Sequence, residues 1–379
     1  MRFAALILAF ALPAAVGAQT APQFQLTREV TIDGVSENLS PVTWLAVSPR
    51  GTIAVGQQQD HLIRYFDAMG KSLGTFGREG EGPGEFRQLT LYGAGWIGDT
   101  MWVTDNGTRR FTLIGPDRKL LRIVPAIVAI KAMGDSGGET QILGPEGLYR
   151  DGSQLVVVLV PSTAEARPHW ARDPQYLDSR LGLIAVKANG EFDRLVTFEP
   201  HDVCGMVPLP TYQLCGRPKL GIDPTAERFG WAAMSYASPD SGTYRITMVG
   251  RDGKTIYSRA YPFAAQPIPK RIRDSLAELG RKGQTPTVRP AYAPRFGPPT
   301  IYPAVENVIV GADGTAWVGL RATPAGKAWV MLSPRGDVVG TAMAPANVVF
   351  QVLGHGVVWG TEKNMDDVES VVRFRVTRR

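Results

Sequence analysis

The sequence predicts an all-β fold: a six-bladed β-propeller whose blades are four-stranded antiparallel sheets. First, short runs of alternating or β-branched residues recur along the chain, with turn signals between them. Second, these runs group into repeating units of four. Third, 42 glycines and 29 prolines are typical of a chain with many turns, and 44% hydrophobic residues suffice for a large core.

The first segment, residues 1–18, is predicted to be a signal peptide. One arginine precedes an apolar run from Phe3 to about Val16, and small residues lead to a cleavage point near Ala18. The run is too short to span a bilayer, and no cysteine follows it to carry a lipid. We therefore expect a periplasmic or secreted protein without a membrane span, whose residues 19–379 form a single propeller domain.

Six repeating units account for most of the remaining chain. The first two read strand, turn, strand, loop, strand, turn, strand, and the third resumes this order after an insertion. The last unit has only three strands. In order, the units cover residues 44–77, 91–124, 146–198, 219–261, 306–344 and 348–376.

The missing strand of the last unit is expected to come from residues 24–31. This segment alternates like a strand and belongs to no unit of its own. An unpaired edge at the end of a repeat array must be covered, and pairing of the two chain ends closes a propeller into a ring. The N-terminal strand should therefore complete the sixth blade.

The glycine-rich stretch "TFGREGEGPGEF", residues 75–86, lies between the first two units. Glycines at this density either cradle a phosphate or let the chain turn sharply. No helix is predicted after them, and no lysine and hydroxyl follow as a phosphate loop requires. We interpret the stretch as a crossing between blades, with Phe76 and Phe86 packing at its two ends.

The first two units resemble NHL-type repeats. In the second unit, Asp105, Arg109 and "RRFTLIGPDRKL" fit the repeat pattern, whereas the first unit has Gln57 and Gln58 where the acidic residue would fall. Together with "GPGEF", these residues make the chain similar to exported bacterial six-bladed propellers that share a "GxGPGEF" stretch, most of them of unknown activity. The resemblance implies a propeller but no particular reaction.

The long loops are expected on one face of the propeller. In an up-and-down meander, second-to-third and blade-to-blade loops emerge together, and the long segments are all of these two kinds. Their basic and aromatic residues suit an acidic glycan or a peptide carboxylate, although scattered solvated arginines are the alternative. The candidate ligand-binding residues are Arg87, Arg167, His169, Trp170, Arg172, Tyr176, Arg289, Tyr292 and Arg295.

A helical insertion is predicted within residues 262–302, between the fourth and fifth blades. Ile272, Leu276 and Leu279 lie on one helical face, and Pro269 suits the first turn. The helix is expected to pack on the propeller. The less favoured alternative is that it forms a cap over a ligand or partner.

Metal ligands are sparse in the sequence. The four histidines occupy four separate contexts, so no cofactor is assigned, although calcium or another divalent ion is possible. Oxygen ligands from scattered loops could hold calcium. The weak candidates are Glu37, Asp105, Glu146 and Asn307, with Asp105 expected mainly to bind backbone amides.

The two cysteines, Cys204 and Cys215, are expected to form a disulfide in an oxidising compartment. A metal site that includes His201 is the less favoured alternative, because structural zinc requires four ligands.

These observations favour a binding or interaction module that uses the loop-rich face. The net charge of +6 gives no argument for nucleic acid as a partner. We expect a monomer that binds an unknown protein, a peptide or an acidic glycan. The alternative is a metal-dependent lactonase-like hydrolase or lyase that acts at the mouth of the central channel, and the catalytic residues of such an enzyme are unknown.

Overall fold

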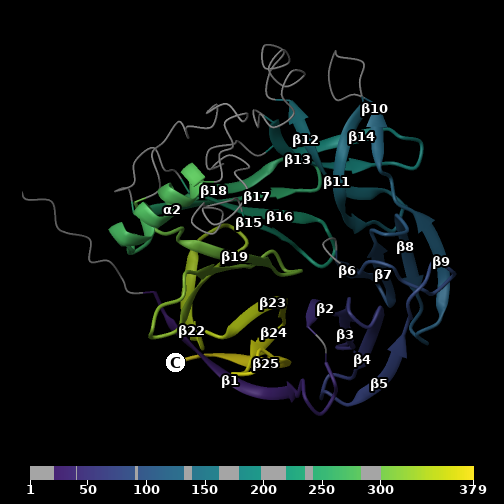
Figure 1. Cartoon of the computed structure of the whole chain (residues 1–379), viewed down its shortest axis with the longest axis horizontal. Coiled ribbons are helices and arrows are strands. Elements are labelled where there is room, and N and C mark those ends of the chain that lie inside the picture. The colour runs from purple at the N-terminus through teal and green to yellow at the C-terminus, as the bar shows by residue number, and fades with distance from the viewer. Residues whose placement is uncertain are drawn as a thin grey trace, which may run out of the picture.

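The computed structural model describes residues 21–39, 41–89, 93–131, 139–161, 179–197, 219–234, 242–282 and 300–379. Within these ranges the chain is almost entirely β-strand, with one short helix, α2 (Lys270–Lys282). Figure 1 shows the sheets arranged around a common centre, with successive sheets side by side. The all-β prediction and the short helical insertion are confirmed.

Three sheets have the predicted form of four antiparallel strands in chain order. Burial differs between the strands of a sheet: in the first two sheets the second strand is largely buried, and the fourth strand has no fully buried residue. The first sheet contains β2 (Val42–Val47), β3 (Ile53–Gln57), β4 (Leu62–Phe66) and β5 (Ser72–Phe76). The second contains β6 (Ala94–Ile97), β7 (Thr100–Asp105), β8 (Arg110–Ile114) and β9 (Leu120–Pro125), and a further sheet contains β15 (Lys219–Ile222), β16 (Arg228–Met234), β17 (Thr243–Gly250) and β18 (Thr255–Pro262).

The third unit has one strand more than the sequence predicted. Its sheet contains β10 (Ala129–Lys131), β11 (Glu139–Leu148), β12 (Gln154–Pro161), β13 (Ser179–Val186) and β14 (Phe192–Thr197). The short β10 pairs antiparallel with the beginning of β11, which extends several residues before the predicted start at Glu146. A three-residue strand carries too little pattern to be recognised in advance.

The last two units form a single eight-stranded sheet, where the sequence predicted two separate blades. One half contains β19 (Val305–Val310), β20 (Ala316–Leu320), β21 (Lys327–Leu332) and β22 (Val338–Ala344). The other contains β23 (Val348–Gly354), β24 (Val357–Lys363), β25 (Glu369–Arg378) and β1 (Gln23–Ile32). The described residues thus form five hydrogen-bonded sheets, and the prediction of six separate sheets is wrong.

The N-terminal strand β1 causes this merger. It pairs antiparallel with β25 over most of its length, as predicted for the closing strand. Its first residues, Gln23 and Phe24, also pair in parallel with Thr341 and Ala342 of β22. One strand therefore completes its own four-stranded half and joins it to the neighbouring half.

The hydrophobic core lies between neighbouring sheets. Between the first two sheets, the buried side chains include Tyr65, Phe86 and Met101. In the eight-stranded sheet, the ring centroids of Trp329 and Phe350 lie 5.1 Å apart, and those of Phe350 and Phe374 lie 5.6 Å apart. Aromatic side chains contribute large buried areas, so such contacts hold the first two sheets together and the two halves of the eight-stranded sheet against each other.

The glycine-rich stretch is a crossing between sheets, as predicted. The rings of Phe76 and Phe86 meet edge to face with centroids 6.0 Å apart, and Phe86 is fully buried. Arg110 donates hydrogen bonds to the carbonyl oxygens of Glu81, Gly82 and Glu85, at 2.6–2.8 Å. These contacts fix a segment whose glycines alone would leave it free to move.

Candidate functional site

A cavity of about 410 Å³ lies where the first strands of the sheets converge. Each of β2, β6, β11, β15, β19 and β23 contributes residues at or near its C-terminal end. This volume is within the range of sites that bind small molecules. Because the turns after β6, β11 and β15 also line it, the cavity lies at the end of the sheets where the tight turns are. We call it the central cavity.

Glu146 is the acidic side chain that β11 brings to the central cavity. The pairing of β11 with β12 shifts register between Pro145 and Gly147, so Glu146 lies at a β-bulge. Bulges often lie next to active sites, where they change the direction in which a side chain points. The residue is half-buried, and this burial raises the pKa of its carboxyl to about 8. No hydrogen bond or ion pair joins the carboxyl to any other described residue.

Asp223 is a second carboxyl in the lining, on the turn after β15. Its Oδ1 accepts hydrogen bonds from the backbone N–H and the hydroxyl of Thr225, at 2.8 and 2.7 Å. Its Oδ2 is buried and accepts no hydrogen bond from the described residues, with Arg228 Nη1 3.9 Å away. Burial raises the pKa of Asp223 more than these hydrogen bonds lower it.

Arg251 and Tyr149 form the rim beside these carboxyls. The Arg251 guanidinium lies 3.9 Å from the centroid of the Tyr149 ring and contacts Asp151 at 3.1 Å and Glu227 at 3.2 Å. The Tyr149 hydroxyl donates to the carbonyl oxygen of Ala226 at 2.9 Å. The positive charge of Arg251 is therefore already matched by two carboxylates.

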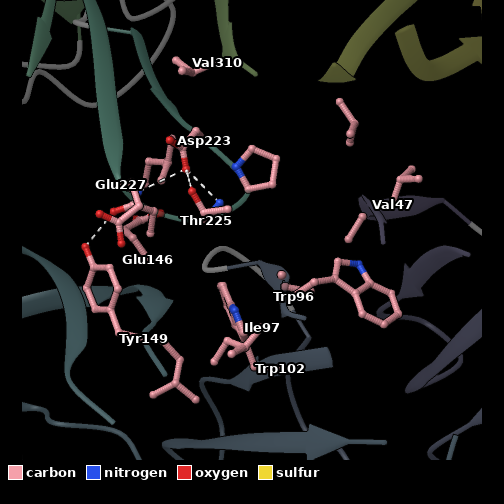
Figure 2. A pocket seen from close by; sticks show the side chains of 18 of the residues that line it. Val47, Trp96, Ile97, Trp102, Glu146, Tyr149, Asp223, Thr225, Glu227 and Val310 are labelled. Atoms are coloured by element: carbon pink, nitrogen blue, oxygen red, sulfur yellow. Dashed lines mark hydrogen bonds between the residues drawn. The ribbon is translucent and has the colours of Figure 1, made fainter. Parts of the chain in front are cut away.

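The rest of the lining combines apolar and aromatic side chains with Gln351, Thr225 and backbone groups. Figure 2 shows Glu146, Asp223 and Glu227 on one side and Trp96 and Val47 across from them. The indole Nε1 of Trp96 is buried without a hydrogen-bond partner in the described part of the chain. The other apolar lining residues include Leu45, Ile97, Trp102, Leu148, Ile222, Val310 and Leu353.

The central cavity lies on the face opposite to the one predicted for binding. It is lined by first-to-second and third-to-fourth turns, whereas the sequence pointed to second-to-third and blade-to-blade loops. Most of those long loops fall outside the described residues, so the predicted loop surface stays a prediction. Sequence reasoning missed Asp223, Tyr149 and Arg251 because it judged the turns by length.

Of the predicted ligand-binding residues, only Arg87 lies in the described chain. Its guanidinium pairs with Glu81 at 2.5 Å, and its backbone N–H donates to Asp105. The others lie outside the described residues; they are Arg167, His169, Trp170, Arg172, Tyr176, Arg289, Tyr292 and Arg295. Cys204 and Cys215 also lie outside the described residues, so their disulfide stays a prediction.

Of the four candidate oxygen ligands, Asp105 and Asn307 form hydrogen bonds with backbone groups. Asp105 binds the backbone N–H groups of Arg87, Gln88, Gly107 and Thr108, which confirms its expected structural role. Asn307 donates its side-chain amide to the carbonyl oxygen of Phe350. Within the described ranges, no three histidine, cysteine, aspartate or glutamate side chains gather as metal ligands would, so Glu37, Asp105 and Glu146 stay separate.

Comparison with known proteins gives likenesses of fold alone. No family model and no curated protein matches the sequence. Among solved structures, the chain is similar to a DUF4221 family member from Bacteroides vulgatus, at 11% identity over 95% of this chain and 98% of that one, with a TM-score of 0.47. A candidate exported protein from Bacteroides fragilis gives 10% identity over 94% and 95%, with a TM-score of 0.48.

Regucalcin from Agrobacterium tumefaciens, a calcium-binding protein, is 11% identical over 95% of this chain and 97% of its own, with a TM-score of 0.41. Likenesses at this level carry no argument about activity or ligand. In the described residues, no helix is long and apolar enough to cross a membrane.

Proposed function

We propose that this chain is a binding protein that holds a small organic molecule in the central cavity. The observation that carries the proposal is Glu146, a half-buried carboxyl aimed at the cavity from a β-bulge without a partner among the described residues. A carboxyl that faces a largely enclosed cavity without a protein partner keeps its hydrogen-bonding capacity for a ligand. A ligand with a matching polar group would pair with Glu146.

The apolar surroundings support the same function. Trp96, Trp102 and Val47 offer a surface on which the body of a small molecule packs, while Glu146 fixes its orientation. Sites that combine apolar walls with a few polar groups are typical of small-molecule recognition. The volume of about 410 Å³ would otherwise hold roughly a dozen water molecules.

A thermal-shift screen of small-molecule classes tests the proposal. We expect at least one class to raise the melting temperature of the wild type, since a ligand that binds only the folded state stabilises it. Val47 lines the central cavity and is half-buried, so Val47→Trp should fill the space and abolish the shift. Equal shifts in both proteins would place binding elsewhere and contradict the proposal.

An enzyme is the second candidate, because a carboxyl that keeps its proton up to about pH 8 can act as a general acid at neutral pH. A hydrolase or lyase at the central cavity would then use Glu146 directly. Turnover of lactones or esters that is lost in Glu146→Gln would favour this candidate over binding alone. The metal-dependent form of the reaction lacks a gathered ligand set in the described ranges.

We further propose that the eight-stranded sheet counts as two blades, which gives a six-bladed propeller of the NHL-repeat-like type. The support is its division into two antiparallel halves whose strands pair with each other only through the short β1–β22 pairing. Export through a signal peptide in residues 1–18, a Cys204–Cys215 disulfide and a monomeric state complete this proposal. An acidic glycan or peptide on the loop-rich face is a separate proposal from the sequence.

A further inference from the structure

The lining of the central cavity contains more carboxyl groups than guanidinium groups. Glu146, Asp223 and Glu227 contribute carboxyls to the lining, and Arg150 and Arg251 contribute guanidinium groups. Arg251 is engaged by Asp151 and Glu227, and it also covers the Tyr149 ring. Arg150 is exposed at the rim, where solvent and salt screen its charge.

The other two carboxyls of the lining, Asp223 and Glu146, have only a long ion pair or no ion pair within the described chain. Asp223 has a side chain with 0% exposure, and its Oδ2 accepts no hydrogen bond from any described residue. The nearest cation, Arg228, is 3.9 Å away and donates instead to the carbonyl oxygen of Ala312 at 3.0 Å. Glu146 has no cation beside it at all within the described chain, since burial alone perturbs its carboxyl.

The opposite wall suits the other half of a cationic ligand. Trp96 and Trp102 both line the central cavity, together with aliphatic side chains that would pack against hydrocarbon. The side of the cavity with Glu146 and the side with Trp96 face each other in Figure 2.

We infer that the central cavity binds a small organic ammonium ion, a protonated amine on an apolar body, with the Glu146 carboxylate as its counter-ion. This inference rests on the proposed function and names its ligand class. A neutral ligand would leave the unmatched carboxyls as they are. An anion beside Glu146 and Asp223 would oppose their ionisation, and Arg251 in the same lining is already paired with Asp151 and Glu227.

Proton release is the signature of this binding mode. In the free protein at pH 7, Glu146 is mostly protonated, because its pKa is about 8. An ammonium ion beside it favours the ionised form, so the carboxyl loses its proton to the buffer as the ligand binds. A neutral ligand that accepts a hydrogen bond from the protonated carboxyl would release none.

Isothermal titration calorimetry on the full chain tests the inference with three probes of the same size. These are 2-phenylethylamine, 2-phenylethanol and phenylacetate, which are cationic, neutral and anionic. We expect the amine to bind at least tenfold more tightly than either analogue. Titrations at pH 7 in two buffers of different ionisation enthalpy should show release of close to one proton per amine bound.

Two variants assign the effect to Glu146. Glu146→Gln should weaken binding of the amine at least tenfold and leave that of the alcohol unchanged. Glu191→Gln removes an exposed carboxylate on the β13–β14 turn and should change neither affinity. The proton-release measurement uses the wild type, so the inference remains testable even if Glu146→Gln does not fold.

The outcomes separate this inference from the proposed function. If the alcohol or the anion binds as tightly as the amine, or if no proton is released, the inference is wrong. If another class of molecule stabilises the wild type but not Val47→Trp, the inference fails and the proposed function stands. If no class of molecule stabilises the wild type more than it stabilises Val47→Trp, both the inference and the proposed function fail.

Discussion

Burial of the Glu146 carboxyl links protein stability to pH. In an unfolded chain this group titrates near pH 4.5, and in the folded protein its pKa is about 8. Between these values the folded state holds a proton that the unfolded state has lost, so stability falls as pH rises. Below about pH 4.5 the carboxyl is protonated in both states and its ionisation costs no stability. Above about pH 8 the loss of stability from its ionisation is complete.

Glu146→Gln should remove this dependence, because glutamine cannot ionise. We expect the free energy of unfolding of the variant, relative to the wild type, to increase by about 1–3 kcal/mol between pH 5 and pH 9. Urea denaturation at several pH values measures the difference, with Glu191→Gln as an exposed control. Parallel pH profiles for the wild type and Glu146→Gln would show that the carboxyl titrates normally.

Gly77 and Gly74 allow a matched test of the glycine-rich crossing. Both have φ of +104°, a conformation that favours glycine. A Cβ on Gly77 would lie 2.6 Å from the Phe86 ring, whereas nothing lies within 4 Å of a Cβ on Gly74. We expect Gly74→Ala to cost about 1–2 kcal/mol from backbone strain, and Gly77→Ala about 1–3 kcal/mol more from the clash.

Chemical denaturation of the two glycine variants gives both values. If Gly77→Ala is no less stable than Gly74→Ala, Phe86 does not hold the crossing as its buried ring indicates.

At the scale of the element, the strand β1 depends on a close approach to β22. A Cβ on Gly340 would lie 2.3 Å from the Phe24 ring and 2.8 Å from the carbonyl oxygen of Pro22. Gly340→Val should therefore displace the beginning of β1, at a cost of about 2–4 kcal/mol. Hydrogen exchange should show faster exchange at residues 23 and 24, because their pairing with β22 is lost while β25 still pairs with the rest of β1.

The control for that variant lies on the same strand. Val338 is 41% exposed on β22, so Val338→Ala should change stability by less than about 0.5 kcal/mol. Unchanged exchange of β1 in Gly340→Val would mean that the β1–β22 pairing adds nothing to the closure.

The sequence predicted the strands well because most of them follow local rules. Alternation, turn residues and a repeating order of four are visible in a single chain, and the pairing of β1 with β25 follows from one missing strand. Asp105 could be interpreted because its partners lie in nearby turns and in the adjacent crossing. These features need no knowledge of how distant units are oriented.

The central cavity could not be predicted in the same way. Glu146 was noted only as a weak metal ligand, because neither the bulge at Pro145–Gly147 nor the burial by other sheets is visible in "GPEG". Asp223 and Arg251 lie 72 residues or more from Asp151 in sequence, and only the ring brings these turns together. The merger of two sheets also depended on a two-residue pairing of β1 with β22.

At the scale of the whole molecule, chelation tests whether a metal supports the fold. The described residues gather no ligand set, so we expect a chelator to change the melting temperature by less than about 1 °C. Elemental analysis of the purified protein should accompany the melting curves. A tightly held divalent ion, with a clear fall in melting temperature on its removal, would favour the metal-dependent enzyme.

The pairing of β1 with β25 brings distant parts of the chain into contact, since the backbone N–H of Arg379 donates to the carbonyl oxygen of Gln23 at 3.0 Å. A short peptide link between residues 379 and 23 would therefore span almost no distance, and the chain could be cut elsewhere without changing which strands pair. A circular permutant opened at the exposed turn of Asn189 and Gly190 should refold to the same circular dichroism spectrum. The fold would then not depend on which of the sheets comes first along the chain.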